Sequence, residues 1–264
     1  MGFRKLFIKL FSYWFKHDDV FQKMVLRLFS DSSFYLQGQM DINSKGKWYN
    51  KEFVNKTGGY FICNDDIPRT ITEFDDWDNT RKDMIILLLR QLLLYKISGS
   101  LAEIGVYKGL TAKLIHYYLP ERKFYLFDTF EGFSYGDLNF EKQKTGLQAR
   151  KEWFNDTSVE GVLNYIKPLN NNIIVIEGHF PDTVDKIIKD EEFAFVHLDA
   201  DLYNPTKEGL EFFYPRLVGG GVILVHDYMS WQGAHDAVND FCMNLHFKPI
   251  TMPDKNGSAL IIKV

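Results

Sequence analysis

Short apolar runs alternate with amphipathic stretches along the chain from residue 99 to the end. The apolar runs predict strands over residues 100–107, 123–130, 172–178, 193–200, 219–228 and 258–264. The stretches between them predict helices over residues 109–119, 157–166, 182–190, 205–217 and 233–243. Strands that are apolar throughout are typical of parallel sheets covered by helices on both faces. The alternation therefore predicts a doubly wound, mostly parallel α/β sheet.

The part of the chain before this alternation is organised differently. Residues 1–80 contain no regular succession of strands and helices, whereas residues 83–95 predict a strongly apolar helix. We therefore expect an N-terminal extension over residues 1–80 and the α/β domain over residues 81–264.

Residues 1–20 carry apolar side chains at helical spacing with basic side chains between them. The apolar members are Phe3, Phe7, Leu10, Phe11 and Trp14, and the basic members are Arg4, Lys5, Lys9 and Lys16. Lys9 interrupts the apolar run, which argues against a signal peptide and against a spanning helix of about 20 apolar residues. Two interpretations stay open: a helix lying on an anionic membrane surface, or a helix packing on its own domain or on a second subunit. We favour packing, because aromatic stripes at this spacing are usually buried, and we expect a homo-oligomer.

Composition and charge narrow the classes of partner. The 264 residues are 45% hydrophobic, which is enough for a sizeable core. The net charge of −4 is spread along the chain without a basic stripe, so nucleic acid is not an expected partner. Cys63 and Cys242 lack the spacing of metal ligands, and we expect both to be packing residues of a cytoplasmic protein.

Polar side chains follow the predicted strands where a doubly wound fold binds its ligands, beyond their carboxyl ends. Asp199 and Asp201 end the fourth strand, and His226 and Asp227 end the fifth. Asp201 lies two residues after Asp199, so it either faces the same way or caps the helix that follows. The order of these residues predicts a cluster of acids at the ligand edge of the sheet.

The first three strand ends indicate the kind of cofactor. Gly105 permits a tight turn after the first strand, and Gly109 lets the next helix begin close to a ligand. The segment lacks G-x-G-x-x-G, which disfavours NAD and FAD. Asp128 ends the second strand, where an acid accepts hydrogen bonds from ribose hydroxyls. Gly178 and His179 end the third strand and suit an adenine ring, so the set as a whole predicts S-adenosylmethionine.

Several segments of the chain also resemble the macrocin O-methyltransferase (TylF/MycF) family, enzymes that methylate sugar hydroxyls with S-adenosylmethionine. The matching segments are "EIGVYKG", "FDTFEGF", "EGHFPDTV", "HLDADLYNPT", "YPRLVGGGVILVHDY" and "GAHDAVNDF". The stretch "IPRTITEFDDWDNTRKDMI" is more loosely similar to the lid that leads into the fold of that family. The resemblance covers roughly residues 60–264 and implies a class I methyltransferase, Rossmann-like fold.

The resemblance also implies roles for single residues. Glu103, together with Gly105 and Gly109, would line the methionine end of the cofactor, and Thr72 in the lid would touch the methionine carboxylate. Asp128 would hold the ribose, while Gly178 and His179 would flank the adenine. Asp199 would be a metal ligand beside the two residues that follow the fifth strand.

The family usually has two adjacent acids after the fifth strand, where this sequence has His226 and Asp227. Three outcomes are open. Asp199 and Asp227 hold Mg²⁺ with weaker affinity, or His226 binds a softer divalent metal, or no metal is needed and His226 or an acid acts as the base. We favour the metal-dependent alternative, because two of the three oxygen donors remain.

The expected function is transfer of a methyl group from S-adenosylmethionine to a hydroxyl of a sugar, nucleotide sugar or glycosylated metabolite. Two alternatives stay open. One is an enzyme of the same fold that methylates a catechol-like phenol between Tyr203, Tyr228 and Trp231. The other is a cofactor-binding protein without methyltransferase activity, in which His226 marks the loss.

Overall fold

A computed structural model of the protein describes residues 78–184, 188 and 190–264. The chain divides into two units, Met1–Tyr60 and Phe61–Val264, and every described residue belongs to the second. The strands are β1 (Ser100–Ile104), β2 (Phe124–Asp128), β3 (Ile173–Glu177), β4 (Phe193–Leu198), β5 (Leu217–Val225), β6 (Ile250–Thr251) and β7 (Ala259–Ile262). The helices are α5 (Asn79–Leu94), α6 (Leu110–Tyr118), α7 (Tyr135–Thr145), α8 (Val159–Ile166), α9 (Tyr203–Arg216) and α10 (Gln232–Asn244).

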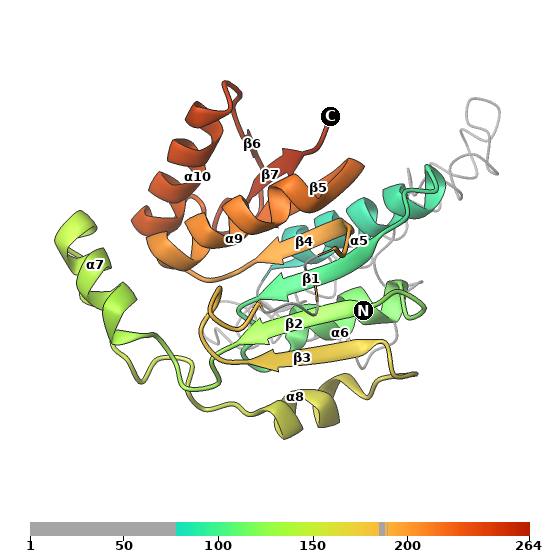
Figure 1. Cartoon of the computed structure of the whole chain (residues 1–264), viewed down its shortest axis with the longest axis horizontal. Helices are drawn as coiled ribbons and strands as arrows, with labels where there is room; N and C mark the ends of the chain where they lie inside the picture. The colour runs from blue at the N-terminus through green and yellow to red at the C-terminus, as the bar shows by residue number, and fades with distance from the viewer. Residues whose placement is uncertain (1–77, 185–187, 189) are drawn as a thin grey trace, which may run out of the picture. The chain divides into compact units, whose positions relative to one another are not determined.

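The strands form one sheet in the order β3-β2-β1-β4-β5-β7-β6 (Figure 1). β1 pairs in parallel with both β2 and β4, and β4 pairs in parallel with β5. β7 runs antiparallel to β5. The chain order reverses at β1, so the carboxyl ends of β1 and β4 border the crevice where such folds bind ligands. The prediction of a doubly wound, mostly parallel sheet is confirmed.

Two hydrophobic cores cover the two faces of the sheet. Alternate residues of each strand point to opposite faces, so Leu101 belongs to the core beneath α5, α6 and α8, whereas Ala102 belongs to the core beneath α9 and α10. The second core is rich in aromatic rings, and Phe213 of α9 contacts Phe193 of β4 at 4.9 Å between ring centroids. Helices on both faces hold the strands rigidly and so fix the positions of their carboxyl ends.

Three elements differ from those that the hydrophobic pattern predicts. Helix α7 was not predicted, because most of its residues are polar and it buries only Asp137 and Glu141. β6 is two residues long and exposed, which leaves no pattern to recognise. A helix was predicted over residues 182–190, but the described residues of this stretch are not helical. Residues 185–187 and 189 lie outside the described part.

Helix α5 begins at Asn79, earlier than predicted, because Asp78 caps it with a side-chain oxygen that accepts from Arg81 N at 3.0 Å. Among the described residues, no helix has the length and apolar character needed to cross a membrane. Thr72 and the basic aromatic segment over residues 1–20 lie outside the described residues.

Candidate active site

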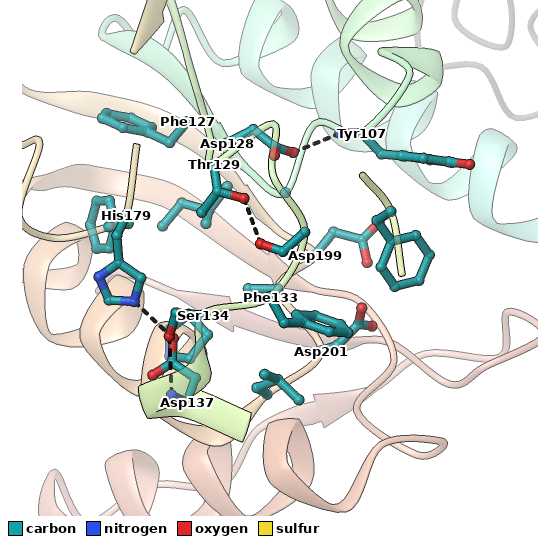
Figure 2. Close-up of a pocket in the computed structure, with 18 of the residues that line it drawn as sticks. Tyr107, Phe127, Asp128, Thr129, Phe133, Ser134, Asp137, His179, Asp199 and Asp201 are labelled. Carbon is teal, nitrogen blue, oxygen red and sulfur yellow. Dashed lines mark hydrogen bonds and ion pairs between the residues drawn. The ribbon is translucent and has the colours of Figure 1, made fainter. Parts of the chain in front are cut away.

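A cavity of about 270 Å³ opens at the carboxyl ends of the strands (Figure 2). Its lining includes residues from the ends of β1, β2, β3, β4 and β5. Of the residues predicted from the sequence, these line it: Gly105, Asp128, Gly178, His179, Asp199, Asp201, His226 and Asp227. The structure therefore brings the predicted strand-end residues together around one space.

Gly105 lies where the chain leaves β1 and touches the chain that leaves β4. Its φ is +82°, and a Cβ added there would lie 2.0 Å from the carbonyl oxygen of Asp199. At the same place, where the chain leaving β1 meets the chain leaving β4, Asp199 N donates to Ile104 O at 2.9 Å. A side chain at position 105 would therefore push the two strand ends apart, since 2.0 Å is far inside van der Waals contact.

Asp128 ends β2 with both carboxylate oxygens facing backbone amides. Tyr107 N donates to one oxygen at 2.8 Å, and Phe130 N donates to the other at 2.8 Å. These bonds fix the carboxylate on the cavity wall, and each oxygen keeps a second lone pair for a ligand hydroxyl. The position agrees with the predicted role in ribose binding, which stays a prediction.

His179 lines the cavity from the end of β3 (Figure 2). Its Nε2 is 2.8 Å from Asp137 Oδ2. Burial lowers the pKa of His179, but the hydrogen bond and charge of Asp137 outweigh burial, so the pKa is raised. Asn204 Nδ2 also donates to Asp137, at 3.1 Å, which ties this side of the cavity to α9.

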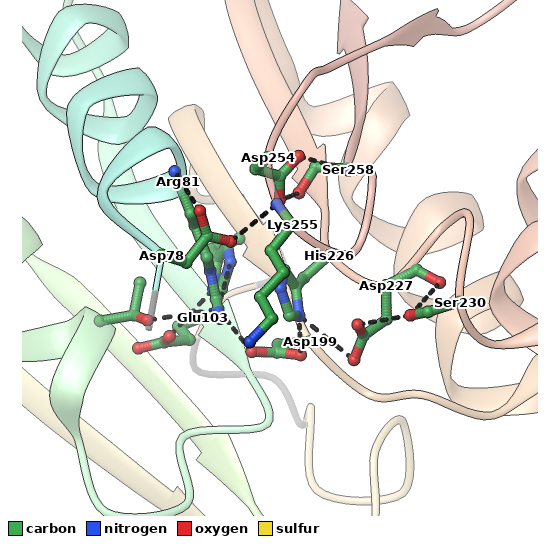
Figure 3. Close-up of polar contacts among 12 residues, drawn as sticks. Asp78, Arg81, Glu103, Asp199, His226, Asp227, Ser230, Asp254, Lys255 and Ser258 are labelled. Carbon is green, nitrogen blue, oxygen red and sulfur yellow. Dashed lines mark hydrogen bonds and ion pairs between the residues drawn. The ribbon is translucent and has the colours of Figure 1, made fainter. Parts of the chain in front are cut away.

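Asp199 is held from two sides by cationic side chains (Figure 3). Arg81 Nη2 lies 2.6 Å from Asp199 Oδ2, with side chains 13% and 23% exposed, and His226 Nδ1 lies 3.0 Å from Asp199 Oδ1. Burial raises the pKa of the Asp199 carboxyl, but the charges of His226 and Arg81 outweigh it and hold that pKa well below its usual range. Asp199 is therefore a fixed anion whose two oxygens both face a donor.

His226 lies between two carboxylates, that of Asp199 and that of Asp227. Its Nδ1 is also 3.3 Å from Asp227 Oδ2, and Ser230 Oγ donates to Asp227 Oδ1 at 2.7 Å. Burial alone would lower the pKa of His226, but Asp199 and then Asp227 raise it to about 9. At neutral pH this imidazole is therefore protonated and donates to the carboxylates.

Asp201 lines the cavity and does not supply the side-chain cap of α9. The N-cap residue of α9, Leu202, makes no side-chain cap hydrogen bond, and Tyr203 N donates to Glu141 Oε2 at 2.9 Å. Burial, and then the charge of Asp199, raise the pKa of Asp201 well above its usual range. Of its two predicted roles, facing the same side as Asp199 is the one observed.

Glu103 and Gly109 do not line the cavity itself. Glu103 is buried in β1, where its Oε1 lies 3.0 Å from His197 Nδ1, and its Oε2 has no hydrogen-bond partner among the described residues. Burial and then Asp199 raise the pKa of Glu103 well above its usual range, whereas burial and then Arg81 lower that of His197 to about 3. Gly109 begins α6 with a φ of +80° and packs near Val162.

Arg81 is the main site residue that the sequence did not reveal. It lies three residues after the capping acid Asp78, and its Nη2 also lies 3.2 Å from His197 Nε2. The capped "DNTRKD" segment marked a helix start, but nothing in it indicates that the first turn of α5 crosses the end of β4.

A sequence model described as macrocin-O-methyltransferase (TylF) matches residues 72–259 of the chain. The chain belongs to this family.

Two curated relatives of the protein are named for the glycosides or antibiotics on which they act. A tetracenomycin rhamnosyl 4′-O-methyltransferase of Streptomyces olivaceus is 25% identical over 172 residues, which cover 61% of this chain and 64% of the relative. Demethyldecarbamoylnovobiocin O-methyltransferase of Streptomyces niveus is 27% identical over 154 residues, which cover 55% of this chain and 58% of the relative. The match thus spans less than two thirds of each relative's length.

Two solved structures share the fold of this family member. The O-methyltransferase NovP superposes with a TM-score of 0.58 at 22% identity, covering 70% of this chain and 80% of NovP. The calicheamicin methyltransferase CalS11 also superposes with a TM-score of 0.58 at 22% identity, covering 81% of this chain and 93% of CalS11. At these identities the likeness shows the fold.

The donor atoms around Asp199 do not fit a magnesium ion well. Ligand atoms of Asp199, His226 and Asp227 lie within 4.8 Å of one another, but magnesium requires an octahedron of oxygens. Arg81 already holds Asp199 Oδ2, and the Nδ1 of His226 carries a proton where a metal needs a lone pair. Two cations, Arg81 and His226, also balance the two anions, Asp199 and Asp227, so the cluster lacks the excess negative charge that attracts a divalent ion.

Proposed function

We propose that the protein transfers a methyl group from S-adenosylmethionine to a hydroxyl of a sugar, nucleotide sugar or glycosylated metabolite. The observation that carries the proposal is the single cavity on which Gly105, Asp128, Gly178 and the Asp199 cluster converge. Membership of the TylF family and the sugar-bearing substrates in the names of relatives support the same reaction.

The residues beside the cavity fit this cofactor. Glu103 Oε2 is buried without a hydrogen-bond partner among the described residues, and the α-ammonium of the cofactor would supply a donor and a positive charge that favour the ionised carboxylate. Asp128 offers free lone pairs to ribose hydroxyls. When bound, the cofactor supplies a methyl group on a sulfonium that leaves as a neutral thioether.

The chain's own residues would then manage the proton of the acceptor hydroxyl. Asp199 faces the cavity and would accept a hydrogen bond from that hydroxyl. Because its pKa is held well below the usual range, Asp199 is a weak base, so the proton leaves while the methyl group is transferred and not beforehand. His226, protonated at neutral pH, would keep Asp199 oriented.

The contacts of Asp199 favour the metal-free alternative over the magnesium-dependent one that the resemblance suggested. They also weaken the catechol alternative, since adjacent phenol hydroxyls need a metal to chelate. Cytoplasmic location and a homo-oligomeric state stay predictions.

Calorimetry with S-adenosylhomocysteine and turnover of labelled S-adenosylmethionine on a panel of glycosides and nucleotide sugars test the proposal. We expect micromolar affinity, typical of small cofactors, and about tenfold weaker binding in Asp128→Ala, because a charged acceptor is lost. Binding without turnover on any acceptor would favour the non-catalytic alternative, and unchanged affinity in Asp128→Ala would remove Asp128 from the cofactor site.

A further inference from the structure

A buried histidine lies between Glu103 and the cluster around Asp199. His197 of β4 is opposite Glu103 of β1 in the strand register, and neither side chain is more than 2% exposed. His197 Nδ1 lies 3.0 Å from Glu103 Oε1, and His197 Nε2 lies 3.2 Å from Arg81 Nη2. The imidazole therefore contacts a carboxyl group with one nitrogen and a guanidinium with the other.

The hydrogen bonds of His197 have one consistent direction. A guanidinium carries donors and no acceptor, so His197 Nε2 accepts from Arg81. The ring proton is then on Nδ1, which donates to Glu103 Oε1. The imidazole thus connects the two side chains, and its orientation depends on both of them.

Arg81 continues this chain of hydrogen bonds to Asp199 (Figure 3). The nitrogen that faces His197, Arg81 Nη2, also donates to Asp199 Oδ2 at 2.6 Å. Thr111 Oγ1 is a more distant acceptor, at 3.4 Å. Because one nitrogen serves both His197 and Asp199, a guanidinium turned away from the ring would also leave Asp199 Oδ2. The position of the His197 ring therefore constrains the direction of the Asp199 carboxylate.

The other end of the chain is a carboxyl oxygen that lacks a partner. Glu103 Oε2 is buried and has no hydrogen-bond partner among the described residues. An unsatisfied buried polar atom costs free energy, and so does a polar pair where two apolar side chains could pack. The chain thus begins at the acceptor that the proposed function gives to the α-ammonium of the cofactor, and it ends at Asp199.

We propose that His197 is a positioning residue that couples the α-ammonium site at Glu103 to Arg81, so that an occupied cofactor site fixes the direction of the Asp199 carboxylate. This inference rests on the proposed function and deepens it, because it gives a route by which cofactor binding prepares the site for the acceptor hydroxyl. A donor at Glu103 Oε2 restricts the Glu103 side chain, and the linked hydrogen bonds then restrict the ring and Arg81. A ligand without the α-ammonium should not have this effect.

The first test uses the wild-type chain. Full-length protein with isotopically labelled arginine is titrated, in nuclear magnetic resonance, with S-adenosylhomocysteine or with methylthioadenosine, which lacks the α-ammonium. The guanidinium signal of Arg81 is assigned by its loss in Arg81→Lys. We expect S-adenosylhomocysteine to shift this signal and slow the rotation of the guanidinium, and methylthioadenosine to leave it unchanged. An equal response to both ligands, or no response to bound S-adenosylhomocysteine, would overturn the inference.

Two variants break the two hydrogen bonds of His197 separately. Glutamine places its amide oxygen near the position of Nε2 and can accept from Arg81, whereas asparagine places its amide nitrogen near Nδ1 and can donate to Glu103. Both variants should abolish the response of the Arg81 signal to S-adenosylhomocysteine. In calorimetry, His197→Gln should weaken S-adenosylhomocysteine about tenfold, the scale of one lost hydrogen bond, and His197→Asn should retain the affinity. Neither should change the affinity for methylthioadenosine.

His116→Gln is the matched control. His116 is also a buried histidine, 3% exposed, but it lies in α6 and its Nε2 accepts from Leu169 N at 3.1 Å. We expect this variant to leave both affinities and the Arg81 signal unchanged. Equal weakening of the two ligands by His197→Gln would mean that His197 acts only on stability, and it would contradict the inference. An Arg81 response that persists in both His197 variants would contradict it as well.

The outcomes separate this inference from the proposed function. If S-adenosylhomocysteine binds but the Arg81 response does not depend on His197, the proposed function stands and the coupling fails. If S-adenosylhomocysteine does not bind, both fail together.

Discussion

Arg81 contacts Asp199, His197 and Thr111 from the first turn of α5. Arg81→Gln should cut turnover by about a hundredfold, because Asp199 loses its orienting partner and its fixed counter-charge. Arg81→Lys should retain part of the activity. Turnover of labelled cofactor, measured with and without chelator, checks the prediction.

The control for this variant is Arg122→Gln. Arg122 is also partly buried, but it donates to the carbonyl oxygens of Ile97 and Gly99 at the amino ends of the strands. A similar loss of turnover in both variants would mean that Arg81 acts only on stability. Activity of the wild type that chelator abolishes would contradict the metal-free reading of the Asp199 cluster.

The raised pKa of His226 makes stability depend on pH. An unfolded histidine titrates near 6.5 and the folded one at about 9, so the protonated imidazole stabilises the folded state in full below pH 6.5. That contribution, roughly 3 kcal/mol at most, should be lost as the pH rises from 6.5 through about 9. Urea unfolding across this range should show the decline, and His226→Asn should flatten it; an unchanged slope in that variant would assign the decline to another group.

Single residues of the site differ in how much the sequence could reveal about them. Asp128, Asp199 and Asp227 each end a strand, so the rule that parallel strands share one ligand edge was sufficient to group them. Arg81 and Asp137 lie in helices α5 and α7. Whether such a helix crosses the ligand edge of the sheet depends on how it packs on the other elements, which the sequence pattern does not indicate. For His226, two opposite interpretations, metal ligand or base, stayed open, because its charge depends on Asp199 and Asp227, which folding brings beside it.

At the scale of elements, the segment between α7 and α8, residues 147–157, which we call the strap, depends on a glycine for its position. Gly132 has a φ of +79°, and its missing Cβ leaves room for Lys151 O. Gly132→Ala should therefore displace the strap and destabilise the fold by about 1–3 kcal/mol. Trypsin should cut faster after Arg150 and Lys151 in this variant.

Gly146→Ala is a matched control for the strap. Gly146 has nearly the same φ, +80°, but nothing lies within 4 Å of an added Cβ. The loss of stability in Gly146→Ala measures backbone strain alone. Any additional loss of stability in Gly132→Ala therefore measures the contact with Lys151. Equal trypsin sensitivity of the two variants would show that this contact does not hold the strap.

Elements with a strong hydrophobic pattern were predictable, and those without one were not. β4, which is buried along its whole length, stood out as an apolar run. Helix α7 did not stand out in the sequence, because capping residues at its two ends stabilise it. The Ser134 hydroxyl accepts from Asp137 N at 3.0 Å, and Gly146 ends the helix in the left-handed conformation. Capping residues of this kind are common in turns as well, so they do not identify a helix by themselves.

At the scale of the whole molecule, a prediction concerns residues 1–20, which carry the basic aromatic pattern described above. We expect their apolar stripe to pack on the protein or on a second subunit, so deleting them should lower the apparent mass or the melting temperature. Light scattering and thermal unfolding measure the two effects. Co-sedimentation of the full-length chain with anionic vesicles, together with an unchanged mass after deletion, would support membrane binding instead.

The strap also has a consequence for changing what the protein accepts. It is one continuous stretch of eleven residues, 147–157, between α7 and α8, and it carries Trp153 and Phe154, of which Phe154 lines the cavity. A laboratory library confined to this stretch would vary one side of the cavity without altering β1, β4 or the residues that hold Asp199. Exchange of this segment alone is therefore the natural starting point for engineering a new acceptor preference.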